Sequence, residues 1–138
     1  MVRYGYFILL LVFAIPVAFA THVPSRKIVE IKINEVGKSE DASENVKSGC
    51  RTFVITEVDV RSFFSKSYPV PLKFNVHDRY SPCFSRGEVK FSDNTRGEWK
   101  ISSSGGGTLL WDTGDVATLF YDDYQWTDPF EDTYSSEN

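Results

Sequence analysis

Runs of alternating apolar and charged residues between Cys83 and Tyr121 constrain the fold of this chain more than any other feature. In the first run, Val89 and Phe91 alternate with charged neighbours. Alternation with period two is typical of a β-strand that meets a core on one face and solvent on the other. Turn-forming clusters such as Ser92–Thr95 separate the runs. The region therefore predicts an antiparallel meander with one apolar and one charged face.

Two parts of this region need separate interpretation. The glycine-rich stretch Ser102–Gly107 could be taken for a phosphate-binding loop, but a P-loop needs a lysine after its glycines and none follows. A hairpin connection explains the glycines better. Val116–Tyr121 is almost continuously apolar, which predicts a central strand covered on both faces, or a strand covered by the helix and an N-terminal arm.

One helix is predicted ahead of the meander, within residues 56–67. Thr56 can cap the first free backbone N–H groups, and Asp59 stands three residues later, at the position of a capping box. The apolar residues at helical spacing are Val60, Phe63 and Phe64. Pro69 ends the pattern, and a helix this short is stable only when it packs on the sheet.

The residues before the helix divide into an arm and a linker. Val29, Ile31 and Ile33 alternate with polar residues, which predicts an N-terminal arm or strand over residues 21–36, with these three side chains on one face. The stretch 37–49 is small, polar and charged, and it predicts a flexible linker.

The main body is predicted to be one α+β domain over residues 50–133, with one short helix packed on an antiparallel β-meander of about four or five strands. Residues 68–82 predict an irregular crossing, or a short strand at Leu72–Val76. The last residues, 134–138, are expected to form a disordered tail.

Two cysteines, Cys50 and Cys83, are predicted to form one disulfide. Closing this loop restricts the unfolded chain by about 3–4 kcal/mol in the entropic description. The alternative is a reactive thiol or a metal ligand. The chain has only two histidines and no C-x-x-C pattern, so a zinc site is poorly supplied.

Residues 1–20 have the features of a secretory signal peptide: Arg3, then an apolar run, then Ala18-Phe19-Ala20 at the end. We expect cleavage after Ala20, a periplasmic or secreted location, and no membrane association after cleavage. The alternative is an apolar segment that is retained as a membrane anchor.

The charge of the chain excludes nucleic acid as a partner, because its net charge is −4 and nucleic-acid binding needs clustered positive charge. Residues 112–138 contain eight acidic residues and no Lys, Arg or His. Aromatic residues alternate with the acids here, and such a segment can bind a basic protein partner. The candidate binding residues are Tyr121, Asp122, Asp123, Tyr124, Trp126 and Phe130. The alternative is that Trp126 and Phe130 fold back and cover the sheet edge.

No pattern predicts a catalytic residue, a metal site or a cofactor. His77-Asp78 is the only His–carboxylate neighbour pair, and the acidic residues after Tyr121 do not have the spacing of a calcium loop. We therefore expect a non-enzymatic binding module. A small hydrolase-like enzyme that uses His77 and a purely structural envelope component are the alternatives.

Three motifs in the chain resemble those of small exported proteins of Proteobacteria that have no assigned function. The motifs are C-x-x-F-x-x-T-E-x-x-V-R-x-F-F at Cys50–Phe64, S-P-C at Ser81–Cys83, and R-G-E-W-x-I-x-x-x-G-G-G at Arg96–Gly107. The resemblance covers about residues 50–130. It implies export and a shared fold, and it implies no activity and no site residues.

Overall fold

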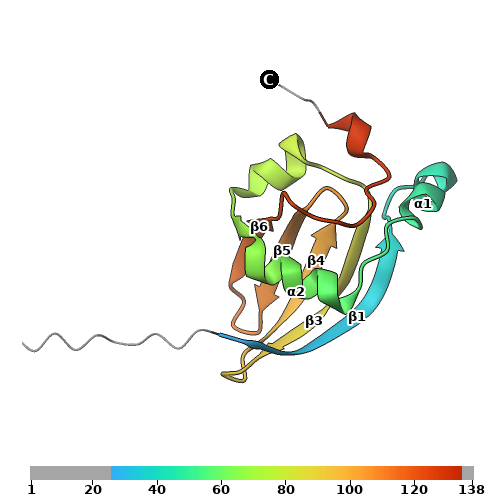
Figure 1. The fold of residues 1–138 in the computed structure, drawn as a ribbon. Coiled ribbons are helices and arrows are strands. Elements are labelled where there is room, and N and C mark those ends of the chain that lie inside the picture. The colour runs from blue at the N-terminus through green and yellow to red at the C-terminus, as the bar shows by residue number, and fades with distance from the viewer. Residues whose placement is uncertain (1–25, 135–138) are drawn as a thin grey trace, which may run out of the picture.

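The computed structural model describes residues 26–134, in which one antiparallel sheet of six strands is covered on one face by a helix (Figure 1). The strands are β1 (Ile28–Lys38), β2 (Tyr68–Pro69), β3 (Phe84–Phe91), β4 (Arg96–Ser102), β5 (Gly106–Trp111) and β6 (Val116–Phe120). The helical elements are α1 (Glu44–Cys50), α2 (Glu57–Lys66), the π-helical segment η1 (Phe74–Asp78) and the short 3₁₀ turn η2 (Glu131–Thr133). The predicted signal peptide at residues 1–20 lies outside the described residues.

The predicted meander is confirmed as β3, β4, β5 and β6, which pair consecutively and antiparallel within the order β1-β3-β4-β5-β6-β2. The expected four or five strands become six, because β1 joins β3 at one edge and the two-residue β2 joins β6 at the other. The predicted central place of Val116–Tyr121 is wrong. β6 is next to an edge, and Val116 at its start is 62% exposed.

The predicted N-terminal strand is β1, an edge strand of the same sheet as the rest of the domain. Its pairing with β3 has three register irregularities, and the first falls between Ile28 and Glu30. Ile31 and Ile33 pack against the core as expected, whereas Val29 is exposed because the irregularity turns it outward. Bulges of this kind also make an edge strand a poor template for another strand.

The flexible linker predicted over 37–49 is not what the structure contains. β1 extends to Lys38, and α1 begins at Glu44 and ends at the disulfide. Gly37, near the end of β1, has a positive φ of 58°, and its N–H donates to the Ser85 hydroxyl at 3.1 Å. The polar composition of the stretch was misleading, because α1 fully buries only its last residue, Cys50, and packs Val46 against the core.

The predicted helix is confirmed as α2, with Thr56 as its N-cap. The Thr56 hydroxyl accepts from the Asp59 N–H at 3.4 Å, and the Asp59 carboxylate accepts from the Thr56 N–H at 2.8 Å. Val60 and Phe63 are buried against the sheet.

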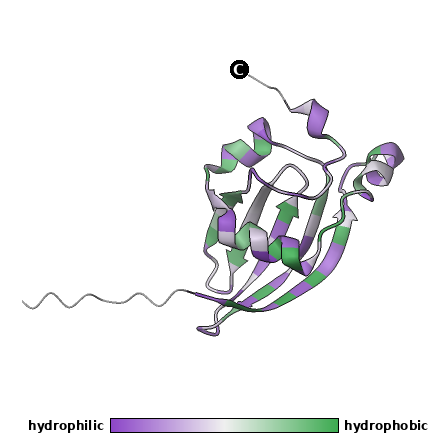
Figure 2. Cartoon of the chain, in the orientation of Figure 1, coloured by the Kyte–Doolittle hydropathy of each residue, from purple (hydrophilic) through white to green (hydrophobic). Residues whose placement is uncertain are grey.

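The core lies between α2 and the inner face of the sheet, and the hydropathy of the strands alternates accordingly (Figure 2). The predicted disulfide joins Cys50 and Cys83, both fully buried. Trp99 is nearly fully buried opposite Gly87, and a Cβ at Gly87 would stand 1.9 Å from the Lys32 carbonyl oxygen. This close approach requires glycine at position 87.

The crossing between α2 and β3 contains η1 rather than the short strand considered at Leu72–Val76. The Asn75 side chain explains where η1 sits. Its amide donates to the carbonyl oxygens of Gly107 and Leu119 at 3.3 and 3.2 Å, which fixes η1 across the ends of β5 and β6.

Candidate functional site

Within residues 26–134 no helix covers most of the width of the sheet face opposite α2, and we call this face the open face. Its members are Glu30, Lys32, Asn34, Glu35, Arg86, Glu88, Lys90, Arg96, Glu98, Lys100, Thr108, Leu110, Val116 and Thr118. Strand alternation places most of them there, because their neighbours in sequence point into the core.

The open face is hollowed along the strands. A central hollow of about 580 Å³ lies over β3, β4 and β5 and reaches Arg86, Glu98 and Leu110. It shares Lys100 and Thr108 with a second hollow of about 460 Å³ beneath η1, and it shares Glu98 with a small hollow of about 100 Å³ at the opposite end. We call these three connected hollows the trough. The two larger ones fall in the size range of ligand sites.

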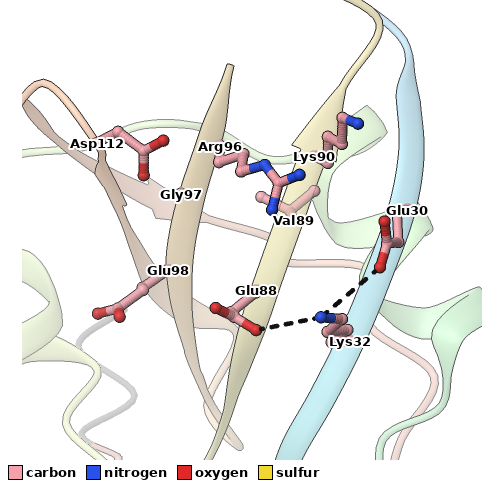
Figure 3. A pocket seen from close by; sticks show the side chains of 9 residues that line it. All are labelled: Glu30, Lys32, Glu88, Val89, Lys90, Arg96, Gly97, Glu98 and Asp112. Atoms are coloured by element: carbon pink, nitrogen blue, oxygen red, sulfur yellow. Dashed lines mark ion pairs between the residues drawn. The ribbon is translucent and has the colours of Figure 1, made fainter. Parts of the chain in front are cut away.

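The charges of the open face form three rows across β1, β3 and β4. The rows are Glu30–Lys90–Arg96, Lys32–Glu88–Glu98 and Glu35–Arg86–Lys100. Between β1 and β3 every row pairs opposite signs. Lys32 lies 4.0 Å from Glu88 and 3.9 Å from Glu30, and Arg86 forms an ion pair with Glu35 (Figure 3 shows the first two rows).

Between β3 and β4 every row pairs equal signs. Lys90 lies opposite Arg96, Glu88 opposite Glu98, and Arg86 opposite Lys100. Like charges directly opposite on neighbouring strands destabilise a sheet. β4 therefore carries the sequence plus, minus, plus, and among residues 26–134 only the last of these charges, Lys100, has an ion pair, with Glu40.

Lys90 on β3 has no ion pair among residues 26–134, and on β4 the same holds for Arg96 and Glu98. Arg96 and Glu98 are both exposed. The Glu98 carboxylate points away from Glu88 and Lys32 (Figure 3). Its cross-strand neighbour on β5 is Leu110, whose side chain is 43% exposed. A carboxylate beside an accessible apolar side chain suits a cationic group that has an aliphatic stem.

At the η1 end, the trough combines apolar and charged walls. Leu72, Val76 and Tyr80 line one side and are each at least 50% exposed. Lys100 lies on the floor, with its ammonium group 4.1 Å from the centre of the Phe84 ring and 3.9 Å from Glu40.

The structure divides the six binding residues predicted after β6. Tyr121 and Trp126 are buried in the core, at 4% and 8% exposure, and so present almost no surface to a partner. Tyr124 stacks on Trp126 with ring centres 5.0 Å apart. Phe130 is half-buried against the core, and Asp122 and Asp123 are exposed. Trp126 and Phe130 thus fold back onto the domain, as the alternative interpretation held, but Trp126 bonds to the β4–β5 turn and not to an edge strand.

A buried polar network holds this C-terminal segment in place. The Asp128 carboxylate accepts from the Ser103 hydroxyl at 2.7 Å and from the Phe130 N–H at 3.1 Å. Ser103 also shares a 2.6 Å hydrogen bond with Ser81. The Trp126 indole N–H donates to the Ser103 carbonyl at 2.9 Å. These bonds fix the segment on the β4–β5 turn, which is a structural role.

Tyr134 belongs to the same network, although the sequence placed it in a disordered tail; residues 135–138 of that tail lie outside the described part. Its ring stacks under the Arg79 guanidinium at 4.7 Å. Its hydroxyl is buried near Asp128 without a well-formed hydrogen bond inside residues 26–134. Burial, followed by the effect of Asp128, raises the pKa of the Tyr134 phenol well above its usual value of 10.

The structure adds no support for catalysis or metal binding. His77 is exposed on η1 and has no hydrogen-bonded hydroxyl or carboxylate within the described residues. Over the same range there is no group of three or more His, Cys, Asp or Glu side chains that could hold a metal ion. Among the helices that the structure describes, none has the length and apolarity needed to span a bilayer.

Sequence reasoning identified the charged face of the hairpin but missed its rows. The signal that could have found them is the strand register, since Glu88 and Glu98 meet only if Gly87 pairs with Trp99. Comparisons of the chain with protein-family models, with curated proteins and with solved structures find no match. The resemblance to small exported proteobacterial proteins stays a prediction.

Proposed function

We propose that this protein is an exported, non-enzymatic binding protein that holds a partner against its open face. The observation that carries the proposal is the run of three like-charged pairs between β3 and β4. These side chains are solvent-exposed or half-buried, so opposite charges could stand at the same positions without any change in the core.

Binding explains this arrangement, because a partner with the complementary charges removes the repulsion when it docks. Surfaces used for recognition often lower the stability of the free protein. Charge complementarity gives such a surface specificity more than raw affinity. The trough supplies the concave shape, and Leu110 and the apolar wall at η1 supply contact area.

Export is supported by the disulfide, since buried disulfides form and persist in oxidising compartments. We place the protein in the periplasm or outside the cell, with Thr21 as the first residue after signal cleavage. Asp122 and Asp123 remain exposed and available for the basic partner that the sequence suggests.

Site-specific photocrosslinking in the source organism tests the proposal on the full chain. A photoreactive residue is placed at Val116 on the open face, and the matched control is at Val58 on α2; these valines are 62% and 72% exposed. We expect a discrete adduct from Val116 only, and we expect it to disappear when Arg96→Glu and Glu98→Lys are combined. No adduct from Val116, or the same adducts from both positions, would contradict the proposal.

A further inference from the structure

The spacing of the charges on β4 defines the partner more closely, if the open face is the binding surface proposed above. Arg96, Glu98 and Lys100 point to one side of the strand at two-residue intervals. That interval is about 6.6–6.8 Å in an extended chain. Lys90, Glu88 and Arg86 repeat the same signs on β3, so each sign extends as a band across both strands.

We infer that the partner is an extended polypeptide segment with the pattern acid-x-base-x-acid, which lies along β3 and β4 in the trough. Side chains at i, i+2 and i+4 of an extended chain share one face and have the same spacing as the bands. The acids would meet the two positive bands, and the base would meet Glu98.

The surroundings of Glu98 fit a lysine or arginine at the central position. The Glu98 carboxylate has no ion pair among the described residues, and Leu110 beside it can pack against an aliphatic stem. A divalent cation fits less well, because positive bands flank the two carboxylates on both sides.

The plus-minus-plus pattern also argues against a second copy of this chain that docks β4 against β4. The pattern reads the same in both directions along the strand, so a face-to-face copy centred on Glu98 would meet like charges in either orientation. For the same reason an acid-x-base-x-acid segment can dock parallel or antiparallel to β4.

Two synthetic peptides of equal composition and net charge test the inference. One has the central sequence Glu-Thr-Lys-Thr-Glu, and the other has Lys-Thr-Glu-Thr-Glu. Backbone amide chemical shifts of the exported protein are followed by NMR during titration with each peptide, for the wild type and for the variant Arg96→Glu/Glu98→Lys.

For the wild type we expect shifts at the open face with the first peptide, and about two- to fivefold weaker binding of the second, because its in-register pose has two repulsive pairs and a shift by two residues restores only two of the three attractive pairs. The variant should prefer the second peptide. A preference that does not reverse, equal binding of both peptides, or no shift at millimolar concentration would overturn the inferred pattern. The photocrosslink from Val116 would still occur in those cases if the open face binds a partner of other chemistry, so the two proposals fail separately.

Discussion

Exchanging the two free charges of β4 should make the protein more stable, and this prediction tests the reasoning behind the binding surface. The double variant Arg96→Glu/Glu98→Lys leaves the net charge unchanged. It places a negative charge opposite Lys90 and a positive charge opposite Glu88. Two like-charged pairs thereby become two opposite-charged pairs.

The magnitude follows from the geometry of the ladder. Directly opposite side chains have Cβ atoms about 5 Å apart, and two unit charges at that distance in water interact with about 0.8 kcal/mol. Reversing one sign changes the interaction by twice this value, and salt screening reduces the change to about 1 kcal/mol per pair. The new side chains at positions 96 and 98 have the signs of Asp112 and Lys100 nearby, which offsets about half of the total.

We therefore expect the free energy of unfolding to rise by about 1 kcal/mol and Tm to rise by roughly 4 °C. The matched control is Glu30→Lys/Lys32→Glu on β1, which turns two opposite-charged pairs with β3 into like-charged pairs and should lower stability by a similar amount. Both changes should nearly vanish in about 1 M salt, where the screening length is about 3 Å.

Urea unfolding at low and high salt provides the measurement, with thermal unfolding as a second readout. The β4 exchange could instead lower stability or leave it unchanged while the β1 exchange destabilises the protein. In that case the like-charged pairs do not destabilise the free protein. The reason for assigning them to a partner would then be lost.

Three further predictions concern the scaffold. Gly87→Ala should reduce stability by at least about 3 kcal/mol or prevent folding, because the new Cβ would collide with a β1 carbonyl. The control is Gly49→Ala in α1, where the new Cβ makes only ordinary contacts, and this change should be neutral or stabilising. Equal effects of the two substitutions in urea unfolding would contradict the close packing of β1 on Gly87. Replacing both Cys50 and Cys83 by Ala should lower the free energy of unfolding by about 3–4 kcal/mol, and a loss below about 1 kcal/mol would refute the loop-closure argument. Because burial raises the pKa of Tyr134, the folded protein keeps a phenol proton that the unfolded chain loses near pH 10, so stability should fall as pH rises above about 10. In Tyr134→Phe, Tm measured by thermal unfolding between pH 8 and 11 should fall less steeply with pH. An unchanged slope of Tm against pH would refute Tyr134 as the origin of the decline.

Local sequence determined the elements whose signals are complete within a few residues. Thr56 and Asp59 specify the start of α2, because both partners of the capping box lie within one turn. The even cysteine pair specified the disulfide, since only one pairing is possible. In contrast, α1 and η1 depend on distant contacts, as the Asn75 bonds to Gly107 and Leu119 illustrate.

The candidate site was beyond reach of local patterns for a related reason. The interleaved aromatic and acidic residues after Tyr121 indicated a surface, but Tyr121 and Trp126 belong to the buried core. Composition does not distinguish an aromatic residue that anchors a partner from one that covers its own sheet. The hydrogen bonds of Trp126 and Asp128 to Ser103 show that this segment covers its own domain.

The sequence by itself determined which residues lie on the charged face of the sheet, because side chains alternate with period two whatever the partner strand. The tertiary structure decided which charges meet. A shift of β4 by two residues would keep every side chain on its face and would pair Glu88 with Arg96 or Lys100. The core and the turn between β3 and β4 oppose that shift, since the Trp99 indole occupies the space left by Gly87 and the turn is closed by the bond from the Phe91 N–H to the Thr95 carbonyl. The like-charged rows follow from this register.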